Sequence, residues 1–394
     1  MTRTPPDTLD RRVRRALGPL IAGRFSSNLA VRFVYPFLPT IARGLGVSLE
    51  AAGVAISIRE LTGLAGPVVG RATDRGQERG IMVVGLGLLA VATAVGGLST
   101  ELGLFTVAMA LVALGQMAYM ISSAAWLADR VIYDRRGMVF GLTELSWAAA
   151  FLVGVPLLGL LIDRFGWRSA FFAVAGLSTV LTVLIGRTLP PDEPVEPGDR
   201  SPGRRHRGAY AVYATVGLIS VAVQLVIVVY GAWFEDAFGF SVAAVGLATV
   251  VIGGSEFLGS GATAVFTDRW GKRTSILVGL GVMVPAAALL GTVGGRVVLG
   301  LVLLALVLVG FEFAFVSSLP LVAELDTGAR GASLGMGAAV ATVARAVGSL
   351  LGTATYTRSG IGLTGVLTAA IGLVAALVLI LGTSEPRHAE PRAS

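Results

Sequence analysis

The stretch from Gly70 to Gly80, GRATDRGQERG, is a charged segment between two long apolar runs. A second charged segment, FTDRWGKRTS, covers residues 266 to 275, and its Thr-Asp-Arg triplet follows the first triplet by 194 positions. This offset is close to half of the 394 residues. Self-similarity at a fixed offset is the signature of an internal repeat. The sequence therefore predicts that one unit of about 195 residues has been used twice.

The same offset, to within one residue, recurs outside these segments. GQMAYMISSAAWLAD from Gly115 matches GFEFAFVSSLPLVAE from Gly310, with the Ser-Ser pairs and the terminal acids in register. Arg136-Gly137 likewise maps onto Arg330-Gly331. The repeat therefore extends well beyond the charged segments.

The composition is that of an integral membrane protein. Hydrophobic residues make up 54% of the chain and charged residues 14%, at a mean hydropathy of +0.80, which would leave a soluble domain without a polar surface. A spanning helix needs about 20 mostly apolar residues, and the chain offers about twelve such runs. The chain has no cysteine and two histidines, so we expect no disulfide, no Cys/His metal site and no cofactor.

We expect an all-α polytopic membrane protein with twelve transmembrane helices in two pseudo-symmetric six-helix halves. The first half (17–187) follows an N-terminal tail (1–16). A polar, proline-rich linker (188–208) connects it to the second half (209–383), which is followed by a C-terminal tail (384–394). After a first helix that continues past Pro36, the expected spans are 51–72, 81–98, 102–128, 138–162, 169–185, 209–234, 242–266, 274–293, 297–323, 333–356 and 361–382.

Basic residues predict the orientation. Most of the 31 Lys and Arg residues fall in the tails, the linker and the loops on the same side as the N-terminus. Positive loops mark the cytoplasmic side. We therefore expect a multi-pass protein of the cell inner membrane with both termini cytoplasmic, and we read its pI of 10.3 as a topology signal rather than as affinity for nucleic acid.

Several charges lie within the expected spans. A charge in hydrocarbon costs about 2.5 to 3.5 kcal/mol even on a lenient scale, so each should face a protein interior or a wet cavity. Arg24 and Glu144 are expected at similar depth in the membrane, and so are Arg32 and Glu60, which suggests two ion pairs. In the second half, Glu256 and Glu312 would compete at one depth for Arg345.

Glu312 is our choice for a proton-coupling site. The less favoured of two competing carboxyls titrates nearer neutrality, and the first half has no acid at the matching position, near Gln116 and Met117. The simpler alternative is that Glu312 neutralises Arg345 while Glu256 bonds a serine or a backbone group. The full set of proton-coupling candidates is Glu312, Glu256, Glu60 and Glu144.

A polar stripe on the first helix, with one residue every four positions, begins the list of substrate-cavity candidates. That list is Arg24, Asn28, Arg32, Arg59, Tyr119, Trp147, Gln224, Tyr230 and Arg345. For the aromatic members, ordinary core or lipid packing is the alternative reading.

The paired loops carry a resemblance to a known family. G-x-x-x-D-R after the second helix and D-R-x-G-K-R after the eighth, with two six-helix halves and a basic linker, resemble the major facilitator superfamily over nearly the whole chain. GVPLLG in the fifth helix (Gly154, Pro156 and Gly159), followed by DRFGWRSAFF, is similar to the drug:proton antiporter branch.

The chain also departs from the family pattern. In the first loop the glycine falls one place early, at Gly76, and Glu78 stands where a basic residue is usual. Ala264 replaces a glycine before the second loop, and the fourth helix lacks the branch's membrane-embedded arginine.

We expect the paired loops to form a cytoplasmic gate. Asp74 would accept from backbone N–H groups at a helix start, where the helix dipole favours an anion, and Arg75 would bridge to Asp129. Asp268, Arg269 and Glu324 would repeat this arrangement. The alternative is a solvated turn that only sets topology. The gate candidates are Gly70, Asp74, Arg75, Asp129, Arg130, Asp268, Arg269, Lys272, Arg273 and Glu324.

We conclude that the chain is a transporter and not an enzyme. GASLG and GSGATA match short enzyme motifs, but both lie in apolar helices without the strand that those motifs require. The resemblance implies alternating access around a site between the halves, most simply proton-coupled efflux of an amphipathic small molecule by a monomer in the bilayer. Passage of an organic anion, or a non-transporting receptor on the same fold, are the alternatives.

Overall fold

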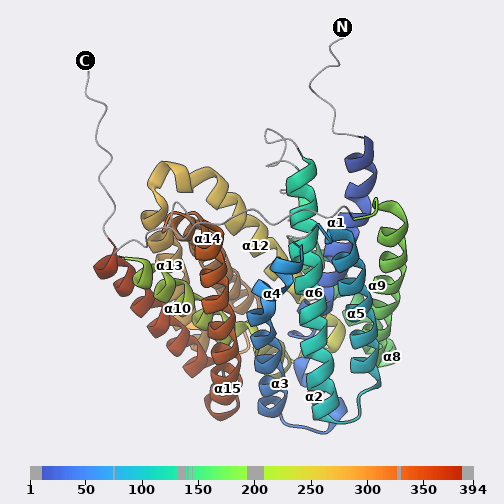
Figure 1. Ribbon diagram of the computed structural model, residues 1–394. Helices are drawn as coiled ribbons and strands as arrows, with labels where there is room; N and C mark the ends of the chain where they lie inside the picture. The colour runs from blue at the N-terminus through green and yellow to red at the C-terminus, as the bar shows by residue number, and fades with distance from the viewer. Residues whose placement is uncertain are drawn as a thin grey trace, which may run out of the picture.

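The computed structural model describes residues 11–73, 76–131, 139, 142–143, 145–192, 208–325 and 330–383, and within these residues the regular structure is entirely helical (Figure 1). The first half contains α1 (Arg11–Arg32), α2 (Leu38–Leu45), α3 (Leu49–Leu61), a 3₁₀ turn η1 (Thr62–Ala65), α4 (Gly66–Thr73), α5 (Glu78–Leu98), α6 (Leu102–Arg130), a π turn η2 (Ala150–Gly154), α8 (Val155–Phe165) and α9 (Arg168–Thr188). The second half contains α10 (Ala209–Ile227), α11 (Tyr230–Phe238), α12 (Val242–Trp270), α13 (Lys272–Leu289), η3 (Leu290–Thr292), α14 (Val297–Ala323) and α15 (Arg330–Gly382).

The helices reach membrane length. Ten segments are long and apolar enough to cross a bilayer, and the last of them, Ser333–Gly382, has 50 residues. That segment bends at Gly360, whose φ of 67° and ψ of −166° break the helix, so it corresponds to two of the expected spans. The charge-rich α1 is not among the ten. The expected count of twelve is consistent with this arrangement.

Close glycine contacts repeat between the halves. A Cβ atom on Gly85 of α5 would lie 2.9 Å from the carbonyl oxygen of Gly115 of α6, and one on Gly279 of α13 would lie 2.6 Å from that of Gly310 of α14. Small residues let spanning helices approach closely. Because both glycine pairs stand at the repeat offset, the two halves build these helix pairs in the same way.

Hydroxyl contacts repeat as well. Thr73 lies 3.1 Å from Ser122 between their Oγ atoms, and Thr267 lies 2.8 Å from Ser317. All four hydroxyls are buried. The duplication seen in the sequence is therefore also a duplication of buried contacts.

The halves meet along two helix pairs. α3 packs against α15, and α8 with η2 packs against α12. Between α8 and α12, a Cβ on Gly159 would lie 3.0 Å from the Cα of Gly246. Elsewhere between the halves, a Cβ on Gly231 of α11 would collide with the carbonyl oxygen of Pro36, in the turn between α1 and α2. The small residues of the fifth-helix motif thus position this interface.

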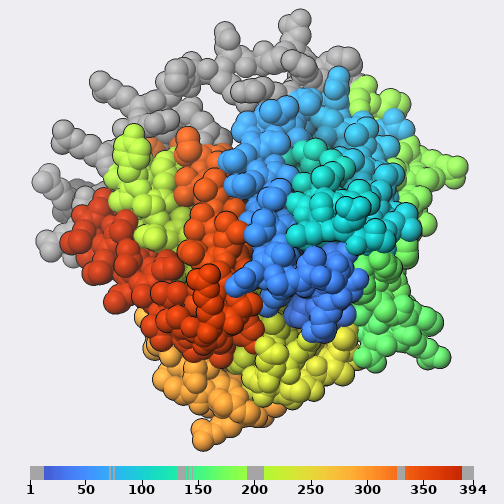
Figure 2. All heavy atoms as spheres, turned by 90° about the horizontal axis from the view of Figure 1, so that it is seen from below, coloured from blue at the N-terminus to red at the C-terminus, as the bar shows by residue number. Residues whose placement is uncertain are grey.

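Contacts between the halves concentrate away from the chain ends. We call the face that holds the start of α1 and the end of α15 the terminal face, and the other the opposite face (Figure 1). At the opposite face Glu235 of α11 bonds Arg43 and Thr40 of α2, and Glu50 of α3 bonds Thr357 of α15. Figure 2 views that face, where segments of both halves abut. Among the described residues, the hydrogen bonds that join the halves lie at mid-depth or at the opposite face.

Candidate functional site

The first mid-depth contact between the halves is a bidentate ion pair. Arg32, the last residue of α1, donates through Nη1 to Glu256 Oε2 of α12 at 2.7 Å and through Nη2 to Oε1. Its guanidinium also donates to the carbonyl oxygen of Trp147 at 2.9 Å and lies 3.9 Å from that ring's centroid and 4.2 Å from the centroid of Phe151. The ion pair is largely buried, with side chains 8% and 12% exposed.

The second mid-depth contact is a cluster centred on Glu60 of α3. Glu60 Oε1 accepts from Arg59 at 2.6 Å and from the Tyr35 hydroxyl at 2.7 Å, and its Oε2 accepts from Arg345 Nε of α15 at 3.0 Å. Gln224 of α10 reaches the Tyr35 oxygen at 3.4 Å. Two arginines of different halves therefore share one carboxylate.

These pairings correct three expectations. Arg32 does not pair with Glu60, because it crosses the interface to Glu256. Arg345 is not the target of Glu256 or Glu312, because it crosses to Glu60. The simpler alternative, in which Glu312 neutralises Arg345, is wrong for the same reason. Each carboxylate pairs with an arginine of the other half. The depth of a residue in the membrane, estimated by counting along its helix, does not show which helix it faces.

The two ion pairs are related by the repeat. Glu60 and Glu256 lie on the equivalent helices α3 and α12, within two positions of the repeat offset. Arg345 has Phe151 as its counterpart 194 residues earlier. Arg32 of α1 stacks over Phe151, so the arginine that the fifth helix lacks is supplied by the first helix.

Glu312 lies on α14 and packs against Gly259 of α12, about one helical turn beyond Glu256. It accepts a hydrogen bond from Ser260 of α12 at 2.8 Å, a residue of its own half. The competition argument for Glu312 as the coupling carboxyl is therefore wrong, whereas its role in coupling stays a prediction. Glu144 lies outside the described residues, so the Arg24–Glu144 pair is not described.

Two residues of the polar stripe of α1, Asn28 and Arg24, are buried inside the first half. Asn28 accepts from Gln116 of α6 at 3.3 Å and donates to Ser146 at 3.5 Å. In this conformation this part of the stripe joins α1 to its neighbours and does not line an open cavity.

The remaining cavity candidates have unequal surroundings. Tyr119 is completely buried and donates to the carbonyl oxygen of Leu20 at 2.9 Å, so it belongs to the core of the first half. Arg59 is also buried and donates to the carbonyl oxygen of Val31. Tyr230 is completely buried, and its hydroxyl has no hydrogen-bond partner among the described residues. Arg345 is only partly buried, with 35% of its side chain exposed.

The charged loops form a repeated contact with reversed signs. Glu78, at the start of α5, accepts from Arg130 at the end of α6 at 3.5 Å. Lys272, at the start of α13, donates to Glu324 after α14. Glu78 and Lys272 are equivalent by the repeat, whereas Arg130 follows Asp129, the residue that aligns with Glu324. The acid at Glu78 that departs from the family pattern is compensated by a base on the neighbouring helix.

Other gate candidates differ from expectation. Arg269 does not pair with Glu324, because Lys272 takes that place, and both Asp268 and Arg269 are exposed. Arg273 donates to the carbonyl oxygen of Ile380 at 2.8 Å. Gly70 lies on α4 and Asp129 on α6, and Asp74 and Arg75 lie outside the described residues. The gate contacts that are described stay within one half.

We expect Asp268→Asn to slow transport without changing the melting temperature of the isolated protein. Asp268 makes no hydrogen bond or ion pair among the described residues. Removing its charge therefore leaves the stability of this conformation unchanged. A gate contact that forms when the terminal face closes would lose a charged acceptor. Transport in proteoliposomes at matched protein content, beside a melting curve, checks both statements. Unchanged transport would reduce the loop to a topology signal.

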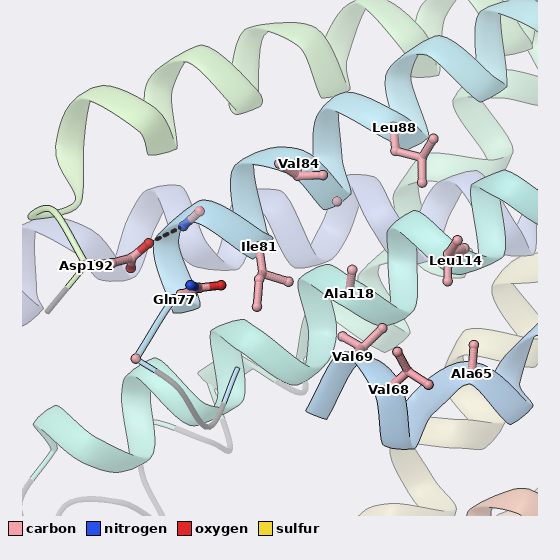
Figure 3. A pocket seen from close by; sticks show the side chains of 13 residues that line it. Ala65, Val68, Val69, Gln77, Ile81, Val84, Leu88, Leu114, Ala118 and Asp192 are labelled. Atoms are coloured by element: carbon pink, nitrogen blue, oxygen red, sulfur yellow. Dashed lines mark hydrogen bonds between the residues drawn. The ribbon is translucent and has the colours of Figure 1, made fainter. Parts of the chain in front are cut away.

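A further cavity lies apart from the ion pairs. It encloses about 900 Å³ between α4, α5 and α6, with Val68, Val84 and Leu114 on its walls (Figure 3). Asp192 closes one end by accepting from the backbone N–H groups of Arg79 at 2.7 Å and Gly80 at 2.8 Å. Val68 and Val84 are strongly exposed, so this apolar cavity opens on the outside of the first half.

A known family model matches this chain. The model of the Major Facilitator Superfamily matches residues 20–326 and, in a second match, residues 212–394. Together the two matches cover both halves. The all-helical architecture and the interface geometry described above agree with this match.

Individual relatives are distant but extend over much of the chain. The uncharacterised MFS-type transporter YbcL of Bacillus subtilis is 25% identical over 89% of this chain and 92% of its own length. The multi-drug resistance efflux pump PmrA homolog of Lactococcus lactis is 25% identical over 66% of this chain and 67% of its own. Among solved structures, a bacterial homolog of the human lysosomal transporter Spinster, inward-facing and unoccupied, superposes with a TM-score of 0.78 at 13% identity, covering 95% of this chain and 97% of that one.

Proposed function

Because the chain belongs to the Major Facilitator Superfamily, we propose that it exports an amphipathic small molecule in exchange for protons. The terminal face is the cytoplasmic one, with both termini and the linker on that side of the inner membrane, since basic loops gather there. The structure described above is then the inward-facing conformation. The efflux pump among its relatives supports this direction of transport.

The observation that carries the proposal is the pair of buried contacts Arg32–Glu256 and Glu60–Arg345 across the interface. Alternating access requires the halves to separate at the opposite face. Separation must break both contacts, and a carboxylate left without its partner in a low-dielectric site favours its protonated form. A step that opens the site outward is thereby tied to proton binding.

Proteoliposomes test the proposal. With a pH gradient imposed across the membrane, we expect the purified protein to drive accumulation of ethidium, a lipophilic cation, and expect the gradient's collapse by a protonophore to stop it. Accumulation that is indifferent to the protonophore would exclude proton coupling. Absence of both accumulation and exchange, for ethidium and for the anionic probe below, would favour the non-transporting receptor.

A second candidate, passage of an organic anion, is favoured by Arg345. It is the most exposed of the mid-depth arginines, and among the described residues its Nη2 makes only a long contact of 3.4 Å, to Thr342. A guanidinium binds carboxylates with two donors, which an ammonium cannot do. On this reading Arg345→Lys lowers uptake of fluorescein about tenfold or more, whereas ethidium transport changes little. Equal effects on both probes would count against an anion site.

A further inference from the structure

The partners of Arg32 and Glu256 are distributed unequally between the halves. Arg32 has a carbonyl acceptor, Trp147, and two aromatic rings within its own half. The hydrogen bonds of Glu256 among the described residues all come from Arg32. When the halves separate, Arg32 keeps stabilising partners and Glu256 loses its own.

A hydroxyl without a partner lies beside this ion pair. Tyr230, at the start of α11, is completely buried, and its hydroxyl makes no hydrogen bond among the described residues. The next residue, Gly231, packs against the backbone of Pro36, four residues beyond Arg32, and the Tyr230 hydroxyl is within electrostatic range of Arg32, Glu256 and Tyr35. A buried polar group left unsatisfied costs free energy. Since Tyr230 belongs to the same half as Glu256, it stays with this carboxyl when Arg32 leaves.

We infer that Glu256 and Tyr230 form a proton-binding site that operates when the opposite face opens. Arg32 departs with the first half, a proton from the outer medium binds one carboxyl oxygen of Glu256, and the Tyr230 hydroxyl donates a hydrogen bond to the other. When the halves close again, Arg32 displaces the proton, which leaves toward the terminal face. This inference rests on the proposed proton coupling and names the group that performs it.

The second ion pair does not offer the same site. Glu60 keeps Arg59 and the Tyr35 hydroxyl, both of its own half, when Arg345 leaves. Its charge therefore remains compensated in either conformation. The unequal distribution of partners thus selects Glu256 over Glu60.

Other titratable groups on the elements around α12 have separate partners or lie near its ends. Glu312 of α14 bonds Ser260, and α14 and α13 contribute Glu324, Lys272 and Arg273 at the terminal face. At the opposite face, Glu235 of α11 bonds Arg43, and Asp236 accepts from Tyr356. The remaining charges on α12 and α8 are Asp268, Arg269, Asp163 and Arg164.

The test follows conformation against pH and needs no substrate. The chain contains no cysteine, so spin labels attach only at introduced ones. Gln77→Cys and Thr274→Cys place labels on exposed positions at the terminal face, one in each half. In the labelled parent, we expect acidification to shorten the distance between the labels, because protonated Glu256 releases Arg32 and the terminal face closes.

Three variants isolate the site. Glu256→Gln, which mimics the protonated carboxyl, is expected to give a short distance that no longer responds to pH. Tyr230→Phe is expected to move the midpoint by about half to one pH unit toward acid, since the protonated state loses one hydrogen bond. Tyr119→Phe, which removes an equally buried hydroxyl that has its own acceptor, should leave the midpoint unchanged.

The outcomes separate the site from the proposed function. A normal pH response in Glu256→Gln, or no shift in Tyr230→Phe, overturns the site and leaves the proton-coupled function standing. Loss of the response in Glu312→Gln, but not in Glu256→Gln, would assign the proton to Glu312 instead. If the labelled parent shows no pH response, the proposed proton site is wrong. The protonophore experiment then decides whether transport is coupled to protons at all.

Discussion

Glu60→Ala is expected to destabilise the protein more than any other single substitution discussed above. The change removes the carboxylate that Arg59 and Arg345 share and the acceptor of the Tyr35 hydroxyl. The side chain of Arg59 is 1% exposed, so its charge has no access to water. Removing one partner of a buried ion pair costs about 3 to 5 kcal/mol.

The control for this substitution is Glu50→Ala. Glu50 is also a glutamate of α3 that reaches the other half, but its contact with Thr357 lies at the exposed opposite face. Exposed polar contacts contribute about 1 kcal/mol or less. Thermal unfolding in detergent should therefore show a much lower melting temperature for Glu60→Ala than for Glu50→Ala. Equal melting temperatures would mean that the cluster around Glu60 does not hold the halves together.

The fold followed from the sequence because its causes are local or repeated. A spanning segment needs an apolar run of fixed length, and duplication preserves contacts such as Gly85–Gly115 and Gly279–Gly310 at one offset. The inner position of the charged residues was predictable too, because the cost of exposing a charge to lipid leaves no other place. The matches to the Major Facilitator Superfamily confirm the family that the paired loops indicated.

The pairing of the charges did not follow from the sequence. Counting residues along a helix gives depth in the membrane, but it does not tell which helix faces which across the interface. Arg32 and Glu60 stand at similar depth, yet Arg32 turns toward α12 and Glu60 toward α15. The π turn at Ala150–Gly154, next to the rings that hold Arg32, also had no signal in the sequence.

The sequence contains a signal for the contact between Glu78 and Arg130. Glu78 departs from the basic residue usual in the family loop, and Arg130 stands at the end of the helix that packs beside it. The second half has the same contact with the charges exchanged, as Lys272 and Glu324. The acid at Glu78 favours a base near the end of the neighbouring helix, where Arg130 stands one residue beyond Asp129, the position that aligns with Glu324.

Joining the halves by a disulfide is expected to abolish transport. Gly63 of η1 faces Thr342 of α15, and a Cβ on Gly63 would lie 3.4 Å from the Cβ of Thr342, near the separation of about 3.5 to 4.5 Å found in disulfides. The chain has no cysteine of its own, so Gly63→Cys with Thr342→Cys creates one possible bond. That bond holds α3 against α15 and prevents the opposite face from opening.

Transport by alternating access requires the halves to separate at this interface in every cycle. The measurement is transport in proteoliposomes by the double-cysteine protein, before oxidation, after oxidation and after reduction, using whichever of ethidium and fluorescein the parent transports. Thr342→Cys alone, treated with the same oxidant, is the control and should keep its activity. We predict that the cross-linked protein loses nearly all transport and regains it on reduction, whereas undiminished transport by fully cross-linked protein would contradict the account.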